Sequence, residues 1–204
     1  MTGSPTPTPT QAPLTVQVLQ TAAALENLAV ECYTAAAAMP LVTRGGGLLR
    51  DLVDRNRSHH AAHALAFNRA LRGAGAARQT AVDARYAPIV RRRLARVTDP
   101  AALADLLTEL ENVNAQTCVR FATLCQDGRL RSLLVDTASV EAQHTAQLLI
   151  QRAFLDGGFG AEDAAPGLAQ AAARTLPATA ATAGIPYAAF PTAEASAINE
   201  GVVR

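Results

Sequence analysis

Four segments of the sequence repeat apolar side chains at alternating spacings of three and four, which places these side chains on one face of an α-helix. The segments run from about Leu14 to Ala38, Leu48 to Arg72, Pro100 to Gln126 and Arg129 to Leu155. At roughly 25 residues each, the helices would be about 40 Å long. Helices of that length in a chain of 204 residues normally lie side by side. The pattern therefore predicts an all-α protein built on an antiparallel four-helix bundle.

The connections predict the order in which the chain passes through this bundle. Short links at Gly45-Gly46-Gly47 and at Asp127-Gly128 join the first helix to the second and the third to the fourth. A longer stretch, Ala74 to Val97, separates the second helix from the third and includes a helical pattern around Ile89–Arg96. We therefore expect one long crossover rather than a simple up-and-down bundle.

The ends of the chain differ in composition from this central part. Residues 1–13 are rich in Thr and Pro, which predicts a flexible arm, and residues 14–158 form the predicted bundle. Residues 159–204 are rich in Ala, Thr, Pro and Gly, and we expect them to form a tail packed on the bundle. Pro186-Tyr187 and Phe190-Pro191 are the expected anchors of that tail.

Composition and charge favour packed helices and give no support for two classes of binding partner. Half of the residues are apolar and only 4% are aromatic, which suits packed helices better than a sheet. The net charge of +1 gives no electrostatic case for binding nucleic acid or an acidic membrane.

Three cysteines are an odd number, which predicts free thiols and a reducing compartment. Without a visible secretory signal or membrane-spanning segment, we predict a cytoplasmic protein, with an exported form whose signal has been removed as the alternative.

The two halves of the predicted bundle resemble each other. Leu25-Glu26-Asn27-Leu28 recurs as Leu110-Glu111-Asn112-Val113, and the segment from Ser58 to His63 recurs as the segment from Ser139 to His144. These matches fall in the same order within corresponding helices. The sequence therefore predicts an internal repeat.

Polar residues interrupt the apolar face at the middle of every predicted helix. They are Glu26, His60, His63, Glu111, Glu141 and His144. Burying carboxylates and imidazoles costs several kcal/mol each unless they are paired or bind a cation. Glu141 and His144 are three residues apart, so both can reach one ion from the same face of a helix. These six residues are the predicted metal ligands.

The order of these residues along the chain resembles the pattern of the ferritin-like superfamily. The resemblance rests on Glu26 followed by Tyr33, then His63, Glu111 and Glu141-x-x-His144. It is closest to bacterial ferritin-like and desiccation-related proteins with a rubrerythrin-like bundle. It implies a ferritin-like antiparallel four-helix bundle with one long crossover and an extended C-terminal tail. It further implies a non-haem metal site, with Glu26 or Glu111 bridging and Glu141 chelating, and an iron- or peroxide-handling oxidoreductase connected with stress.

One residue departs from the family pattern. This chain has His60-x-x-His63 where the family has Glu-x-x-His, which leaves three carboxylates and three imidazoles. Imidazole favours transition metals over magnesium and calcium. We expect iron, with zinc, manganese or copper as alternatives, in a mononuclear or dinuclear site. Two questions stay open: whether the protein is an enzyme or an inactive scaffold for stress-related binding partners, and whether it forms a homodimer.

Residues around the predicted site have less definite roles. Asn56 and Asn114 would orient ligands or join helices, and Tyr33 would serve redox transfer or packing. Cys118 would be a soft ligand only if the site extended one turn deeper. The remaining candidates are expected at the surface: His59, Glu31 and Glu109.

Overall fold

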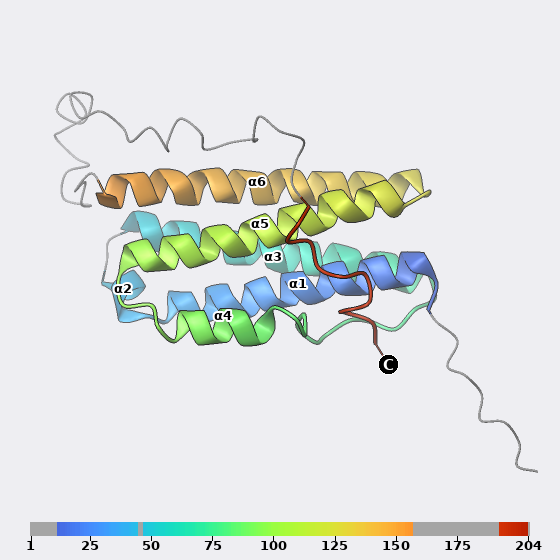
Figure 1. Cartoon of the computed structure of the whole chain (residues 1–204), viewed down its shortest axis with the longest axis horizontal. Helices are drawn as coiled ribbons and strands as arrows, with labels where there is room; N and C mark the ends of the chain where they lie inside the picture. The colour runs from blue at the N-terminus through green and yellow to red at the C-terminus, as the bar shows by residue number, and fades with distance from the viewer. Residues whose placement is uncertain (1–11, 45–46, 157–191, 204) are drawn as a thin grey trace, which may run out of the picture.

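The computed structural model describes residues 12–44, 47–156 and 192–203, and this part of the chain contains six helices and no strand (Figure 1). The helices are α1 (Leu14–Ala37), α2 (Pro40–Thr43), α3 (Gly47–Gly73), α4 (Ala87–Leu94), α5 (Pro100–Leu124) and α6 (Gly128–Asp156). The four long helices lie side by side, and each corresponds to one predicted segment. The predicted all-α bundle is confirmed.

The bundle is made of two helical hairpins. α1 packs mainly against α3, and α5 packs mainly against α6, whereas the contacts between the two hairpins are fewer. The crossover from α3 to α5 contains α4, which packs against both α1 and α5 (Figure 1). The predicted crossover, with its short helical stretch, is therefore confirmed.

Local chemistry explains where the helices begin and end. Asp99 precedes α5 and its side chain accepts a hydrogen bond from the backbone N–H of Ala102 at 2.8 Å, with Pro100 at the first helical position. α3 ends at Gly73, and Gly75 follows with a positive φ of 69° that glycine adopts without strain. The short helix α2 was not predicted; it begins at Pro40 after Met39 adopts an extended conformation.

Two apolar clusters fill the bundle on either side of its middle. One contains Tyr33, Leu49 and Leu107, and the other contains Phe67 and Phe121; all five side chains are buried. The three cysteines, Cys32, Cys118 and Cys125, are buried and free, as predicted. No helix in the described ranges is both long enough and apolar enough to cross a membrane.

The C-terminal segment, residues 192–203, crosses α5 and α1 (Figure 1). The backbone N–H of Ser196 donates to Thr117 Oγ1 at 2.8 Å, and that of Gly201 donates to Thr21 Oγ1 at 3.0 Å. A Cβ atom on Gly201 would lie 2.5 Å from Thr21 Cα, so this close approach to α1 requires glycine. The anchors predicted at Pro186-Tyr187 and Phe190-Pro191 lie outside the described residues.

Candidate metal centre

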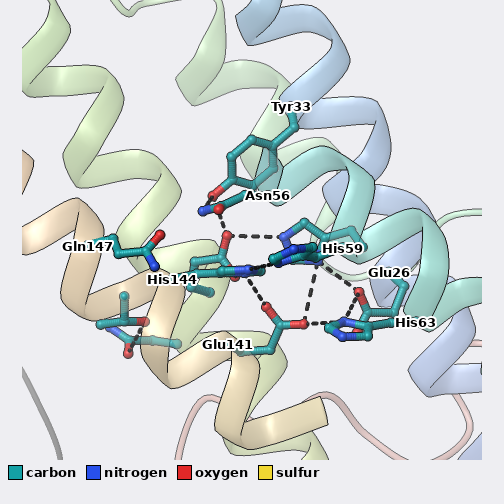
Figure 2. A network of polar contacts seen from close by, with 12 residues as sticks. Glu26, Tyr33, Asn56, His59, His63, Glu141, His144 and Gln147 are labelled. Carbon is teal, nitrogen blue, oxygen red and sulfur yellow. Dashed lines mark hydrogen bonds and ion pairs between the residues drawn. The ribbon is translucent and has the colours of Figure 1, made fainter. Parts of the chain in front are cut away.

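Six polar side chains from all four long helices meet at the middle of the bundle, between the two apolar clusters (Figure 2). Five of them are at most 1% exposed and the His63 side chain is 16% exposed. They are Glu26 on α1, His60 and His63 on α3, Glu111 on α5, and Glu141 and His144 on α6. The structure thus brings together all six residues that the sequence singled out.

One set of donors, called group 1, consists of Glu26, His60, His63 and Glu141, whose ligand atoms all lie within 4.8 Å of one another. Glu26 Oε2 lies 2.8 Å from His60 Nδ1 and 3.6 Å from His63 Nδ1. Glu141 Oε1 lies 2.8 Å from His63 Nδ1 and 3.6 Å from His60 Nδ1. Ligand atoms around a tetrahedral ion with bonds of about 2.0 Å lie about 3.3 Å apart. Group 1 therefore has the dimensions of a four-ligand metal site.

A second set, called group 2, consists of His60, Glu111, Glu141 and His144, with ligand atoms within the same 4.8 Å limit. His144 Nδ1 lies 2.9 Å from Glu141 Oε2 and 3.3 Å from Glu111 Oε2. His60 Nε2 lies 3.1 Å from Glu111 Oε1. All four residues are buried.

Two side chains belong to both groups. Glu141 directs Oε1 to His63 in group 1 and Oε2 to His144 in group 2. His60 directs Nδ1 to Glu26 and Nε2 to Glu111. The two groups are therefore halves of one cluster, and each half depends on the same two residues.

Both ring nitrogens of His60 lie at hydrogen-bonding distance from a carboxylate oxygen. An ionised carboxylate only accepts hydrogen bonds, so without a bound ion both nitrogens donate and His60 is an imidazolium, which must lose one proton before it can bind a metal. Burial alone would lower the pKa of His60, but the charges of Glu111 and Glu141 and the bonds to Glu111 and Glu26 raise it well above its usual value. His60 thus places a positive charge between Glu26 and Glu111.

The pKa values of the other cluster residues are shifted as well, in directions that differ between the residues. Burial would lower the pKa of His63, but hydrogen bonds to Glu141 and Glu26 raise it to about 10. Burial and the negative charge of Glu26 raise the pKa of Glu141 to about 7, so Glu141 is the carboxyl group that holds a proton most readily. Against the effect of burial, the charge of His60 and the bond from His144 hold the pKa of Glu111 well below its usual range.

These shifts predict that the stability of chelator-treated protein falls as the pH rises. His63 keeps its proton in the folded state up to a pKa of about 10, whereas an unfolded histidine loses it near 6.5. Its stabilising contribution is complete below pH 6.5 and is lost as the pH approaches 10. The raised pKa of Glu141 acts in the same direction between about pH 4.5 and 7. Urea unfolding should show a loss of roughly 3 kcal/mol from His63 between pH 6.5 and 9.5. His60 and His144, whose pKa values are also raised, add to this loss.

The His63→Gln variant is the control for this pH dependence, because it removes one of the imidazoles whose pKa is raised in the folded state. Its unfolding free energy should fall less steeply above pH 7 than that of the wild type. A wild-type profile that is flat from pH 6.5 to 9.5 would contradict the assignment of charge within the cluster.

Tyr33 of α1 and Asn56 of α3 lie next to each other (Figure 2) and support Glu111. The Tyr33 hydroxyl donates a hydrogen bond to Glu111 Oε1, and Asn56 Nδ2 lies 3.4 Å from the Tyr33 oxygen. Burial and the charge of Glu111 raise the pKa of Tyr33 well above its usual value, so the hydroxyl keeps its proton. The packing role considered for Tyr33 therefore includes a hydrogen bond to a candidate ligand.

His59 is exposed, as predicted, but it also contacts the cluster. Its Nδ1 atom lies 2.9 Å from Nε2 of His144, the nitrogen that faces away from the carboxylates. Burial and the positive charge of His144 lower the pKa of His59. The sequence analysis did not predict this contact. The feature that could have indicated it is the position of His59, one helical turn before His63.

The other candidates near the site, Glu31, Glu109 and Cys118, are not among the six residues of the cluster. Glu31 is partly exposed and pairs with Arg91 of α4, and the exposed Glu109 pairs with Arg93 of α4. Cys118 is buried, and its pKa is raised by burial and by the charges of Glu26 and Glu141. Among the described residues it belongs to neither donor group.

The cluster fits a transition-metal ion in two respects. Mixed imidazole and carboxylate donors suit iron, zinc and copper better than magnesium or calcium. In addition, Asn114 is 1% exposed, lies one turn from Glu111, and has no hydrogen-bond partner for either amide atom in the described part of the chain. A buried polar group without a partner costs about 1–3 kcal/mol, so an ion or its bound water would suit the surroundings of this amide.

Comparison with known proteins gives one match. The model of a family described as a ferritin-like domain matches residues 14–152, which include all six residues of the cluster. No curated protein and no solved structure matches the chain.

Proposed function

Because the chain belongs to the ferritin-like domain family, we propose that it is a non-haem metalloprotein that holds one transition-metal ion at the centre of its bundle. The observation that carries this proposal is the convergence of three carboxylates and three imidazoles from four helices in a buried core. Such a set is costly to bury unless charges are matched, and a cation matches them directly. Which of these six residues bind the ion is part of the proposal.

We expect one ion because the two donor groups share His60 and Glu141. Group 2 is the better candidate position. Its four members are all buried, whereas group 1 includes the partly exposed His63. Tyr33 also holds one of its carboxylates, Glu111, through a hydrogen bond from outside the cluster. Ligands that are held from outside in this way are oriented before the ion arrives.

The proposed activity is iron- or peroxide-handling oxidoreductase chemistry, which the family resemblance implies. A bound redox-active ion would supply the electron transfer. The residues of this chain would hold that ion with carboxylate and imidazole groups, and the apolar clusters around Tyr33 and Phe121 would exclude bulk water. Glu141, whose pKa of about 7 makes it the most readily protonated carboxyl group of the ion-free cluster, would give up its proton when it binds the ion.

Metal analysis of protein purified without chelators tests this proposal. We expect about one equivalent of a transition metal, iron being the first candidate. The His144→Ala variant should lose the ion, because it removes a ligand of group 2 alone, and His63→Ala should keep most of it. Iron oxidation and peroxide consumption are then measured on the loaded protein. The proposal is wrong if the wild-type protein binds no stoichiometric metal.

A second candidate function is a ferritin-like scaffold without turnover that binds stress-related partners. The observation that favours it is the imidazolium of His60, which lies between Glu26 and Glu111 and balances their charge without an ion. The two candidates give opposite results in the same assays. A scaffold would contain no stoichiometric metal and would neither oxidise iron nor consume peroxide.

A further inference from the structure

His59 lies outside both donor groups, yet it is joined to one of their members (Figure 2). Its Nδ1 atom and Nε2 of His144 are 2.9 Å apart, which is the distance of a hydrogen bond. His59 comes from α3 and His144 comes from α6, so this contact also joins the two hairpins. His59 is itself exposed, and in the described part of the chain its hydrogen bond to the cluster is the one made by Nδ1.

The relative position of the two rings identifies the contact as an in-plane hydrogen bond. The ring planes differ by 19° and the ring centroids are 5.1 Å apart. That separation is close to the 2.9 Å between the two nitrogens plus the radius of each ring. The two nitrogens therefore lie near the line that joins the ring centres, as a linear N–H···N bond requires. Two rings stacked face to face would not place these nitrogens on that line.

The proton arrangement follows from the other side of His144. Nδ1 of His144 faces Glu141 Oε2 at 2.9 Å and Glu111 Oε2 at 3.3 Å, so Nδ1 is the atom that can bind an ion in group 2. A neutral imidazole that binds metal through one nitrogen carries its proton on the other. Nε2–H of His144 would then donate to Nδ1 of His59. Ligand histidines usually donate this second proton to a carboxylate, a backbone carbonyl or water.

We propose that His59 is a positioning residue for the metal site: it accepts the hydrogen bond from His144 Nε2 and so fixes the ring of His144 with Nδ1 directed at the ion. This inference depends on the proposed metal site, and it adds a residue that does not touch the ion. Within the described residues, His144 is the one imidazole of the cluster that is hydrogen-bonded to a side chain outside it. Mutation of such outer partners typically weakens metal binding about 10- to 100-fold.

Cobalt(II) alone is the probe for the test, because its visible spectrum reports the ligand geometry. His59→Leu keeps the volume of the side chain and removes the acceptor. We expect it to weaken Co²⁺ binding 10- to 100-fold in competition with a chelator, and to alter the visible spectrum. His59→Asn can place its amide oxygen near the position of Nδ1, so its affinity should lie within about threefold of the wild type, with an unchanged spectrum.

Gln147→Ala is the matched control. Gln147 Oε1 accepts a hydrogen bond from Arg55 at 2.9 Å across the same two helices, one turn beyond His144, and among the described residues no hydrogen bond joins it to a candidate ligand. Its loss should leave the affinity and spectrum unchanged. Because His59 and Gln147 are not buried, all three variants should fold, and thermal unfolding of chelator-treated samples verifies this.

Three results would overturn the inference while leaving the metal site in place. They are a His59→Leu variant that binds Co²⁺ like the wild type, a His59→Asn variant as weak as His59→Leu, and a Gln147→Ala variant with the same loss. If the wild-type protein itself binds no Co²⁺, the proposed function fails, and the role of His59 fails with it.

Discussion

Replacement of Glu141 by alanine is expected to abolish stoichiometric metal binding. Glu141 is one of two residues common to both donor groups, so its loss removes a ligand wherever the ion binds. It also leaves His63 and His144 without their closest carboxylate partner, since Oε1 and Oε2 lie 2.8 Å and 2.9 Å from these rings. Removing one member of a buried ion pair costs about 3–5 kcal/mol. Elemental analysis and urea unfolding measure the two effects.

Glu141→Gln and Glu109→Ala are the controls for this experiment. Glutamine keeps the size of the side chain, so Glu141→Gln separates loss of the ligand charge from loss of packing; it should also lose the ion. Glu109 lies on α5 in an exposed pair with Arg93, and its replacement should change stability by no more than about 1 kcal/mol and leave metal content unchanged. Stoichiometric metal in both Glu141 variants would contradict the assignment of Glu141 as a ligand.

Replacement of His60 by glutamate is expected to have the second large effect, a change from one bound ion to two. It would restore the Glu-x-x-His pattern that the family resemblance implies for this helix, giving four carboxylates and two imidazoles. Without metal, the variant would bury carboxylates at the place where the wild type has an imidazolium between Glu26 and Glu111. We expect chelator-treated His60→Glu to lose at least about 3 kcal/mol of stability.

Metal titration followed by thermal unfolding tests this expectation. The melting temperature of His60→Glu should rise strongly with added manganese or iron, and elemental analysis should give close to two equivalents. His60→Gln provides the comparison, because it removes the imidazole without adding a charge; it should bind at most one ion. If His60→Glu binds one ion with wild-type stability, His60 does not limit the number of ions in this bundle.

The sequence predicted the helices and their buried faces well, because both follow from local periodicity. Glu26 and Tyr33 on α1, and Glu111 and Cys118 on α5, are buried as the three–four spacing requires. Asp99 caps α5 for an equally local reason, since its side chain and the N–H of Ala102 are three residues apart.

The pairing of atoms inside the cluster could not be predicted in the same way. Whether His60 contacts Glu26, Glu111 or both depends on the rotation of α3 against α1 and α5 by a fraction of a helical turn. The contact of His59 with His144 depends on the same rotation, and periodicity alone placed His59 at the surface. The path of residues 192–203 over Thr21 and Thr117 depends on backbone contacts that leave no periodic pattern.

The division of the bundle into two hairpins has a consequence for its motions. Because α1 packs mainly with α3 and α5 with α6, the easiest way to open the molecule is to separate the hairpins as two units. That opening must break the bonds from His60 to Glu111 and from His63 to Glu141, which join one hairpin to the other. An ion held by both hairpins would act as a cross-link, so metal occupancy would set how often the buried core meets solvent.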